Sequence, residues 1–334
     1  MRCTIKDVAK LAKTSPATVS LVLNHRPGVK ESTKQRVLEA VDELNYRPNQ
    51  MARSLINRRT NNIGLVVTDI HNPFYADLAY NLQKETIRND VNLTIGISNN
   101  KVKNEKRIVE SMITRGVDGI LIAPARDGEG HLEHLHELKA LKIPFVFVTS
   151  AYRGIEADTV MTDLEQGTYE LTKHLISNGK KRISFIVESP KLLHVEERLK
   201  GFDRALSEHR EDDVEGWSLE VSPEVENSIK IVDQKLWNRN PDAVITINAY
   251  TALSVMKILK DKNIVIPNEI AIASFDDFEF VSILYTPLTV VKQPIEEISK
   301  ESIKLLEQRI ETYEGEPSIQ LLPGELVIRE STYK

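Results

Sequence analysis

Short apolar runs alternate with longer amphipathic stretches over most of the chain. In its first half the runs read NIGLVV, LTIGIS, GILIAP and PFVFVT, and in its second half RISFIVE, AVITIN and IAIASFDD. Each run has the length of a buried strand, and the stretches between them have helical spacing. Strands that alternate with helices predict parallel sheets with helices on both faces. The two series of runs predict two lobes within residues 62–334.

The loops that follow several of these runs are rich in polar and aromatic residues. They read TDIHNPFY, INAY and SFDDFE. Ligands of open parallel sheets bind beside the carboxyl ends of the strands. We therefore expect a ligand pocket in a cleft between the two lobes.

The first sixty residues carry the signals of short helices instead. Thr4 and Asp7 have the spacing of a capping box. The apolar positions that follow at helical spacing predict a helix to about Lys13, and they are Ile5, Val8, Leu11 and Ala12. Ser15 is a favoured N-cap residue and Pro16 suits the first helical position, so a second helix is predicted over residues 16–24.

A third helix is predicted over residues 31–44 from its apolar spacing. The side chains expected to face inward are Val37, Leu38, Val41 and Leu44. Two short helices joined by a tight turn and supported by a third are typical of a helix-turn-helix unit.

The second helix has two unlike faces. Val19, Val22 and Leu23 share one face and can pack on a core. The opposite face is small and uncharged, and it consists of Ala17, Ser20, Leu21 and Asn24. Such a face can approach the floor of the major groove. There Ser20 and Thr18 can bond bases or phosphates, while an apolar side chain such as Leu21 can touch a thymine methyl group.

Charge is distributed unevenly along the chain. Residues 1–60 hold twelve Lys and Arg and five Asp and Glu, a charge of +7, while the whole chain carries −5. The remainder therefore carries −12, so a basic segment precedes an acidic body. This asymmetry favours a head that binds a polyanion. The alternatives are a solvated charged face and a three-helix interaction module that binds no DNA.

Cysteine and hydropathy indicate the compartment. The only cysteine is Cys3, so no disulfide framework can form. No apolar run reaches the length of a membrane span, and the first residues lack a secretory pattern. A cytoplasmic protein without a membrane partner is expected.

Two stretches, TIKDVAKLAKTSPATVSLVLN and VLEAVDELNYRPNQMARSL, resemble the DNA-binding head of the lac-repressor/galactose-repressor family. The similarity continues through almost the whole chain. It implies a hinge helix from about Asn49 to Leu55, which in the family folds on the operator in the minor groove. Leu55 would be wedged between base pairs, with Ala52 and Arg53 in the same groove. The alternative for Leu55 is a buried linker residue.

The resemblance also implies three segments, which are a helix-turn-helix domain (1–47), a hinge and linker (48–61) and an effector-binding and dimerisation core (62–334). Its expected DNA contacts are Thr4, Ser15, Pro16, Ala17, Thr18, Ser20, Leu21, Asn24, Asn49, Ala52, Arg53 and Leu55. Two positions depart from the family. Leu21 stands where an Arg that reads bases is usual, and Lys13 stands where the turn usually has Gly.

For the body, the resemblance implies a two-lobed core like that of periplasmic binding proteins. The N-lobe would comprise about 62–161 plus 292–322, and the C-lobe about 162–291 plus 323–334. The chain would cross between lobes near residues 160–162, 289–293 and 321–326. The implied effector-binding residues are His71, Phe74, Asp163, Arg198, Asn248, Asp276 and Gln293.

These residue types suit a polyol. Asp276 can accept from two hydroxyls and Arg198 can donate in a fork, and Phe74 can stack on an apolar sugar face. The alternative is that Arg198 and Asp276 simply pair with each other. His71 either binds the effector or narrows the pocket.

Together these features predict a homodimeric transcriptional repressor on a palindromic operator, controlled by a small polar effector. Aromatic residues make up only 6% of the chain. The family resemblance, more than the residues themselves, favours a sugar or sugar derivative over a purine. The chain ends without a heptad tail, so dimers are expected. No nucleophile motif or phosphate loop is present, and the His131, His134 and His136 spacing is read as part of an exposed helix. No catalytic residue, metal or cofactor is therefore expected. A transport-type binding protein and a sugar-modifying enzyme are the rival classes.

Overall fold

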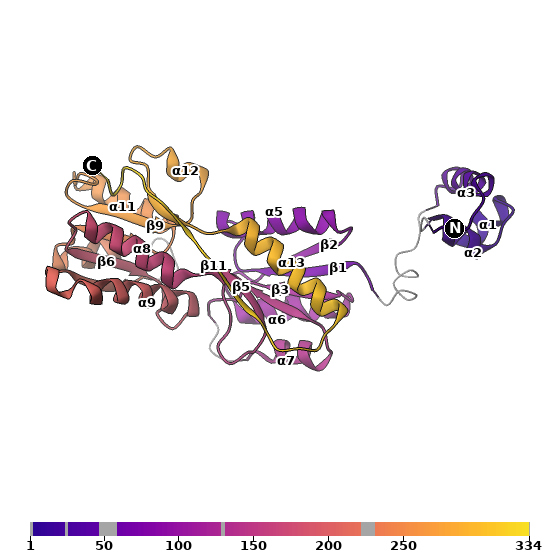
Figure 1. Cartoon of the computed structure of the whole chain (residues 1–334), viewed down its shortest axis with the longest axis horizontal. Helices are drawn as coiled ribbons and strands as arrows, with labels where there is room; N and C mark the ends of the chain where they lie inside the picture. Colours follow the sequence, from indigo (N-terminus) through magenta and orange to yellow (C-terminus); the bar gives the residue numbers. More distant parts are fainter. Residues whose placement is uncertain (1–2, 24–25, 47–58, 128–130, 222–230, 334) are drawn as a thin grey trace. The chain divides into compact units, whose positions relative to one another are not determined.

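The computed structural model describes residues 3–23, 26–46, 59–127, 131–221 and 231–333. The chain divides into two compact units, Met1–Thr60 and Asn61–Lys334. Within these described residues, the smaller unit holds three helices and the larger unit holds two sheets with their helices (Figure 1). Among the described residues, no helix is long and apolar enough to cross a bilayer.

Side-chain hydrogen bonds cap the first two of the three described helices of the small unit. The three helices are α1 (Ile5–Leu11), α2 (Pro16–Leu23) and α3 (Glu31–Glu43). The backbone N–H and the hydroxyl of Thr4 donate to the Asp7 carboxylate at 2.9 and 2.7 Å, which completes the predicted capping box. The Ser15 hydroxyl accepts from the Thr18 N–H at 3.1 Å. These bonds satisfy N–H groups that the first helical turn leaves unpaired, and they confirm both predicted helix starts.

All three helices contribute to a small apolar core. Its buried residues are Val8, Ala9, Ala12, Val19, Val22, Val37 and Ala40. One predicted inward position was wrong, because Leu38 is 39% exposed, and Leu11 of α1 is likewise 41% exposed. Leu38 directly follows the buried Val37, and a helix turns by about 100° per residue, so this step carries its side chain out of the apolar stripe.

The turn between α1 and α2 is held by a lysine in a left-handed conformation. Lys13 has a φ of 51°, and α1 ends two residues earlier, at Leu11. This backbone region favours glycine because it has no Cβ. The chain therefore adopts a glycine-type turn without the glycine, and the helix is shorter than its apolar spacing predicted.

The large unit contains two six-stranded sheets, and the first has the strand order β11-β5-β4-β3-β1-β2. Its strands are all parallel. They are β1 (Asn62–Val67), β2 (Asn92–Ile97), β3 (Gly119–Ile122), β4 (Phe145–Val148), β5 (Asp158–Thr162) and β11 (Ile319–Leu322). The helices of this lobe are α5 (Pro73–Arg88), α6 (Val102–Thr114), α7 (Glu133–Ala140) and α13 (Ile295–Glu311).

The second sheet has the order β12-β10-β9-β8-β6-β7, with β12 antiparallel to β10. Its strands are β6 (Arg182–Val187), β7 (Glu215–Glu220), β8 (Ala243–Thr246), β9 (Ala271–Phe275), β10 (Thr289–Lys292) and β12 (Glu325–Val327). Its helices are α8 (Leu164–Ser177), α9 (Leu193–Glu208), α11 (Ala249–Asp261) and α12 (Glu279–Ser282), with 3₁₀ turns at Arg210–Asp212 and Leu236–Arg239.

Each sheet has apolar packing on both faces, because successive side chains of a strand point to opposite sides. In β1, Leu65 packs with Leu78 of α5 and Leu306 of α13. The next residue, Val66, packs in a separate cluster with Val109 of α6. This two-sided burial explains why the strands read as continuous apolar runs, and it confirms the predicted α/β architecture with helices on both faces.

The chain passes between the two sheets three times. It leaves the first sheet after Thr162 and enters α8 of the second lobe. It returns between β10 and α13, whose Ile298 and Leu305 pack on the first sheet. The last passage joins β11 to β12 (Figure 1). These passages place the carboxyl ends of both sets of parallel strands next to the same cavity, which is described below.

Candidate functional site

The outer face of α2 is small, uncharged and accessible. Val19 and Val22 point into the core of the small unit, while Ala17 is exposed and Leu21 is 40% exposed. Ser20 is half-buried between these two faces. The predicted faces of this helix are therefore confirmed for the described residues. Asn24, Asn49, Ala52, Arg53 and Leu55, together with the predicted hinge helix, lie outside the described residues.

Several predicted DNA contacts already have local hydrogen-bonding roles. The hydroxyl of Ser15 lies 2.9 Å from that of Thr18. The hydroxyl and the backbone N–H of Thr4 both donate to Asp7, and these two hydrogen bonds lower the pKa of the Asp7 carboxyl. Pro16 occupies the first position of α2. These side chains therefore stabilise the first turns of α1 and α2.

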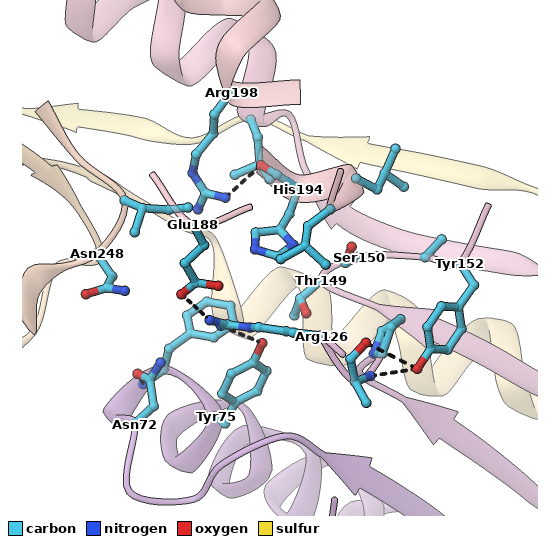
Figure 2. A pocket seen from close by; sticks show the side chains of 18 of the residues that line it. Asn72, Tyr75, Arg126, Thr149, Ser150, Tyr152, Glu188, His194, Arg198 and Asn248 are labelled. Carbon is cyan, nitrogen blue, oxygen red and sulfur yellow. Dashed lines mark hydrogen bonds and ion pairs between the residues drawn. The ribbon is translucent and has the colours of Figure 1, made fainter. Parts of the chain in front are cut away.

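The large unit contains a cavity of about 530 Å³ between its two lobes. It is lined by the loops after β1, β3 and β4 of the first lobe and after β6, β8 and β9 of the second (Figure 2). This is the position that parallel-sheet topology predicts for a ligand. Five of the seven residues predicted from sequence line it, and they are Phe74, Arg198, Asn248, Asp276 and Gln293.

The other two predicted residues do not line this cavity. His71 is exposed, and its backbone N–H donates to the Asp69 carboxylate at 2.9 Å in the loop before α5. Asp163 caps α8 by accepting from the Gln166 N–H at 2.9 Å. Its carboxylate is thus turned toward its own helix, as the N-cap position requires.

Arg198 is a deeply buried cation. It is 5% exposed, and its guanidinium lies 4.2 Å from the centre of the Phe275 ring. One N–H donates to the His194 carbonyl at 3.0 Å, while its Nε has no partner. Burial lowers the pKa of Arg198 to about 10. Among the described residues no carboxylate lies within ion-pair distance of it, so the alternative of a direct pair with Asp276 was wrong.

Asp276 instead bonds to a crossing between the lobes. The Gln293 side-chain amide donates to its carboxylate at 2.7 Å and accepts from the Thr162 hydroxyl at 2.8 Å. Thr162 ends β5 and Gln293 follows β10, so this chain of bonds joins two crossings. Burial raises the pKa of Asp276. Asp276 also has a φ of 74°, a rare conformation that such a bonded carboxylate helps to hold.

Asn248 has a double role at the start of α11. Its side-chain oxygen accepts from the Thr251 N–H at 2.9 Å and from the Thr251 hydroxyl at 3.1 Å. The cap fixes the rotamer of Asn248 at the cavity wall, and the side-chain amide nitrogen stays available to a ligand. Sequence alone indicated the residue, and the structure adds the helix cap that positions it.

An ion pair between the lobes was not predicted from sequence. Arg126, in the loop after β3, donates to Glu188, after β6, at 2.5 Å, and it also donates to the Tyr75 hydroxyl at 3.4 Å (Figure 2). Glu188 directly follows β6 and Arg126 lies four residues after the end of β3, so the rule that ligands bind at strand ends could have singled them out. The pairing joins residues of different sheets, which no local pattern reveals.

His194 lies between the two arginines. Figure 2 shows its ring in the middle of the pocket, between Arg198 on one side and Arg126 on the other. Its Nε2 is buried and has no partner. Burial, and then the charges of Arg126 and Arg198, lower the pKa of His194 well below its ordinary value. At neutral pH the ring is therefore uncharged, and the pocket presents two guanidinium groups on either side of it.

A second polar cluster supports the wall of the cavity. Glu105 of α6 bonds to the Nε2 atom of His134 of α7 at 2.8 Å and to the hydroxyl of Tyr152 at 3.0 Å. The side chains of Glu105 and His134 are fully buried, so the expectation of an exposed helix was wrong for His134. No group of three metal-binding side chains occurs among the described residues.

Family models match both parts of the chain. Residues 4–49 match the model "Bacterial regulatory proteins, lacI family", and residues 172–332 match a periplasmic binding protein-like domain. The helix-turn-helix unit and the two-lobed core with its cleft therefore occur together in one known family architecture.

Whole-chain comparisons agree with these matches. The chain is 31% identical to catabolite control protein A of Priestia megaterium over 99% of this chain and all of that protein. It is 32% identical to the HTH-type transcriptional repressor PurR of Aliivibrio salmonicida over 99% of both. The structure of the lac repressor dimer bound to operator and the anti-inducer ONPF has a TM-score of 0.87 at 22% identity, covering 99% of each chain. This chain therefore belongs to the lacI family of bacterial regulatory proteins, and it is a DNA-binding transcription regulator and not an enzyme.

Proposed function

We propose that the protein is a repressor that binds a palindromic operator as a homodimer and responds to a sugar or sugar derivative in the cavity between its lobes. The observation that carries the proposal is the cavity itself, where hydrogen-bonding side chains of both lobes meet at the strand ends. The exposed, uncharged face of α2 supports DNA reading. The names of the PurR relative and of the lac repressor support repression as the direction of control.

A homodimer agrees with the apolar surface of both lobes. Tyr80 and Ile87, seven residues apart on α5, are each 68% exposed, and Ile95 and Ile97 are exposed on the edge strand β2. In the second lobe Tyr250, Ile283 and Tyr285 are exposed. A second copy of this chain, related by a two-fold axis, is the partner we propose for these surfaces. The same symmetry matches a palindromic operator.

The cavity suits a hydroxylated ligand. The Asp276 carboxylate has an oxygen that Gln293 leaves open, and the Asn248 amide nitrogen can donate. Phe74 and Tyr75 meet edge to face at 5.2 Å and supply an apolar wall. Apolar sugar faces pack on such rings while their hydroxyls bond to carboxylates and amides.

Control would run through the crossings between the lobes. A ligand bound to Asp276 contacts a group that is tied to Gln293 and Thr162. Occupancy can therefore bias the relative orientation of the lobes, and with it the operator affinity, by about 5- to 150-fold. The regulator would act in the cytoplasm, where the operator is.

Selection of bound duplexes from a random DNA library tests the proposal. Purified full-length protein should recover a palindrome with one fixed half-site spacing. The selection is repeated with pools of sugars, sugar derivatives and purines. A consensus whose recovery changes with a sugar pool supports the proposal, and a change with purines alone would reject the effector class. No consensus under any condition would reject sequence-specific repression.

A further inference from the structure

The loop that follows β3 is attached to the start of α6 on both sides of Arg126. Before Arg126, the buried Ala125 N–H donates to the Glu105 carboxylate at 2.9 Å. After it, the Asp127 carboxylate accepts from the Val102 N–H at 2.7 Å. Val102 is the first residue of α6, so Asp127 satisfies an N–H that the helix itself leaves unpaired. Arg126 is therefore held between two hydrogen bonds to one helix.

Glu105 also anchors the segment that follows β4. The oxygen that accepts from Ala125 accepts from the Tyr152 hydroxyl at 3.0 Å, and that hydroxyl lies 2.8 Å from the Ala125 nitrogen (Figure 2). Ala125 and Tyr152 line the cavity formed by the described residues, whereas Glu105 is fully buried behind them and does not line it. One buried carboxylate thus determines the position of two loops of the cavity wall.

The other oxygen of Glu105 faces His134 of α7. It lies 2.8 Å from the Nε2 atom, and both side chains are fully buried. A carboxylate oxygen can only accept, so Nε2 carries the proton. The Nδ1 atom has no partner within the described part of the chain, so the neutral ring, which leaves only a lone pair unpaired there, fits this site. Glu105 therefore accepts from three donors, each on a different element, and its own position is tightly defined.

Arg126 carries this anchoring to the second lobe. Its guanidinium pairs with the Glu188 carboxylate at 2.5 Å and lies 3.4 Å from the Tyr75 hydroxyl (Figure 2). A guanidinium is a rigid, planar donor, so its pairing with a carboxylate depends strongly on geometry. The backbone bonds on either side of Arg126 determine where its side chain begins, and hence whether it meets Glu188.

We propose that Glu105 is a positioning residue for the contact between the lobes, and that it acts through Ala125 to hold Arg126 opposite Glu188. This inference rests on the proposed function of the cavity as the site of control. It gives a regulatory role to a residue that is buried behind the cavity wall. Without the Glu105 carboxylate, the loop after β3 opens more often and the pair between the lobes is lost with it.

Hydrogen exchange of the Ala125 amide in the full-length protein measures the local anchoring. Glu105→Met keeps the side-chain length without an acceptor, so this amide should exchange about 10- to 100-fold faster, the effect of a lost hydrogen bond to a charged group. Glu105→Gln should retain most of the protection. Its amide oxygen still accepts from Ala125, and its NH₂ group can donate to His134 once the ring proton moves to Nδ1.

Operator affinity separates positioning from a loss of stability. It is measured by fluorescence anisotropy for Glu105→Met, Glu188→Gln and the double variant, with the selected operator. Each single variant should change the affinity in the same direction, by at least about fivefold, the lower end of typical coupling between sites. The double variant should match Glu188→Gln, because both changes act on one contact.

Two further variants complete the test. Val109→Ala is the matched control on α6, because it truncates a fully buried side chain and leaves Glu105 in place. It should lower the stability of the protein without changing local exchange at Ala125 or operator affinity. Tyr152→Phe removes the hydroxyl that bonds to both Glu105 and Ala125. It replaces Glu105→Met in both measurements, with the same expected directions, if that protein does not fold.

The outcomes separate this proposal from the proposed function. If Ala125 exchanges in Glu105→Met as it does in the parent, or if the two single effects on operator affinity simply add, the positioning role is wrong. If Glu188→Gln leaves operator affinity unchanged, the contact between the lobes carries no control and the proposal is wrong, while the sugar-controlled repressor stands. If the parent binds no operator, the repressor function is rejected, and exchange at Ala125 still decides whether Glu105 anchors the loop.

Discussion

Lys13, in the turn between α1 and α2, has a left-handed backbone conformation that residues with a Cβ rarely adopt. It has a φ of 51°, and its N–H donates to the carbonyl of Lys10 at 3.3 Å. A side chain in this left-handed region costs about 1–2 kcal/mol. The neighbouring Ala12 and Val19 are buried in the helical core, and their packing holds the turn in place. The head thus keeps its turn at the expense of local strain.

Replacing this lysine with glycine should stabilise the head. We expect Lys13→Gly to raise its unfolding free energy by up to about 1 kcal/mol, because glycine adopts the left-handed region freely, although its more flexible unfolded state offsets part of the gain. Lys10→Gly, inside α1, is the matched control and should cost about 1 kcal/mol. Hydrogen exchange of head amides in the full-length protein measures both. Equal losses for the two variants would contradict the strain at Lys13.

His194 should make stability sensitive to acid. Its folded pKa lies well below the unfolded value, since burial and two arginines disfavour the charged ring. Above about pH 6.5 the His194 ring is neutral in both the folded and the unfolded protein, so it causes no loss of unfolding free energy. As pH falls below that value the unfolded state takes up the proton first, and stability is lost by up to about 1.4 kcal/mol per unit until the folded pKa is reached.

Thermal unfolding between neutral pH and pH 5 measures this loss. His194→Gln should flatten the pH dependence, whereas the same change at the exposed His131 should leave it as in the parent. His174, whose pKa burial also lowers, will retain a smaller dependence in all of these proteins. A His194 variant with the full acid sensitivity of the parent would show that another group is responsible.

Individual cavity residues were predictable where they end a strand or start a helix. Asn248 lies two residues after β8 and Asp276 directly follows β9, so the strand-end rule and the family resemblance agree on them. Arg126 and Glu188 also follow strands, but their pairing depends on how two separate lobes meet. The hydrogen bond from Gln293 to Asp276 could not be read from sequence either, because it joins a crossing between the lobes to the end of another strand.

At the scale of elements, the strands were predicted well because they are buried on both faces. NIGLVV is β1 to the residue, and RISFIVE extends one residue past β6. Helix faces were harder to predict in the small head. There Leu11 and Leu38 fit an apolar spacing but lie outside a core that a few valines and alanines fill. A core of this size buries fewer side chains than the number of apolar residues that the helices contain.

Two helix caps provide a comparison of structure with function. Asn248 caps α11 and lines the cavity, while Asp163 caps α8 and does not line it. Replacing either with Ala should cost about 0.5–2 kcal/mol of unfolding free energy. We expect only Asn248→Ala to weaken the binding of the effector pool as well, by about tenfold, the effect of one lost hydrogen bond. Calorimetry on both variants checks this, and equal losses of affinity would place Asp163 in the site.

At the scale of the whole molecule, a basic segment of +7 precedes a body of −12. The negative body repels the negative phosphates of DNA. Electrostatic attraction between the protein and the operator is therefore confined to the first sixty residues. The fold places regulation in the acidic part of the chain and DNA binding in the basic part.

Salt should therefore weaken operator binding steeply. If the two heads of a dimer neutralise roughly six phosphates, affinity should fall by about a thousandfold between about 50 and 200 mM salt. Fluorescence anisotropy with the selected operator gives the slope of log affinity against log salt. A flat dependence would refute binding through the basic segment, whereas effector binding, which does not involve that segment, should change far less.

The bonds from Asp276 through Gln293 to Thr162 have a consequence for how this regulator evolves. The carboxylate proposed to select the ligand is held by a residue of one crossing, which is held in turn by a residue of another. A mutation at Asp276 that changes ligand specificity therefore also changes the hydrogen bonds that link the crossings between the lobes. Genetic selections for a new inducer should recover changes at Gln293 and Thr162 alongside cavity changes, and many of those alleles should be constitutive or unresponsive.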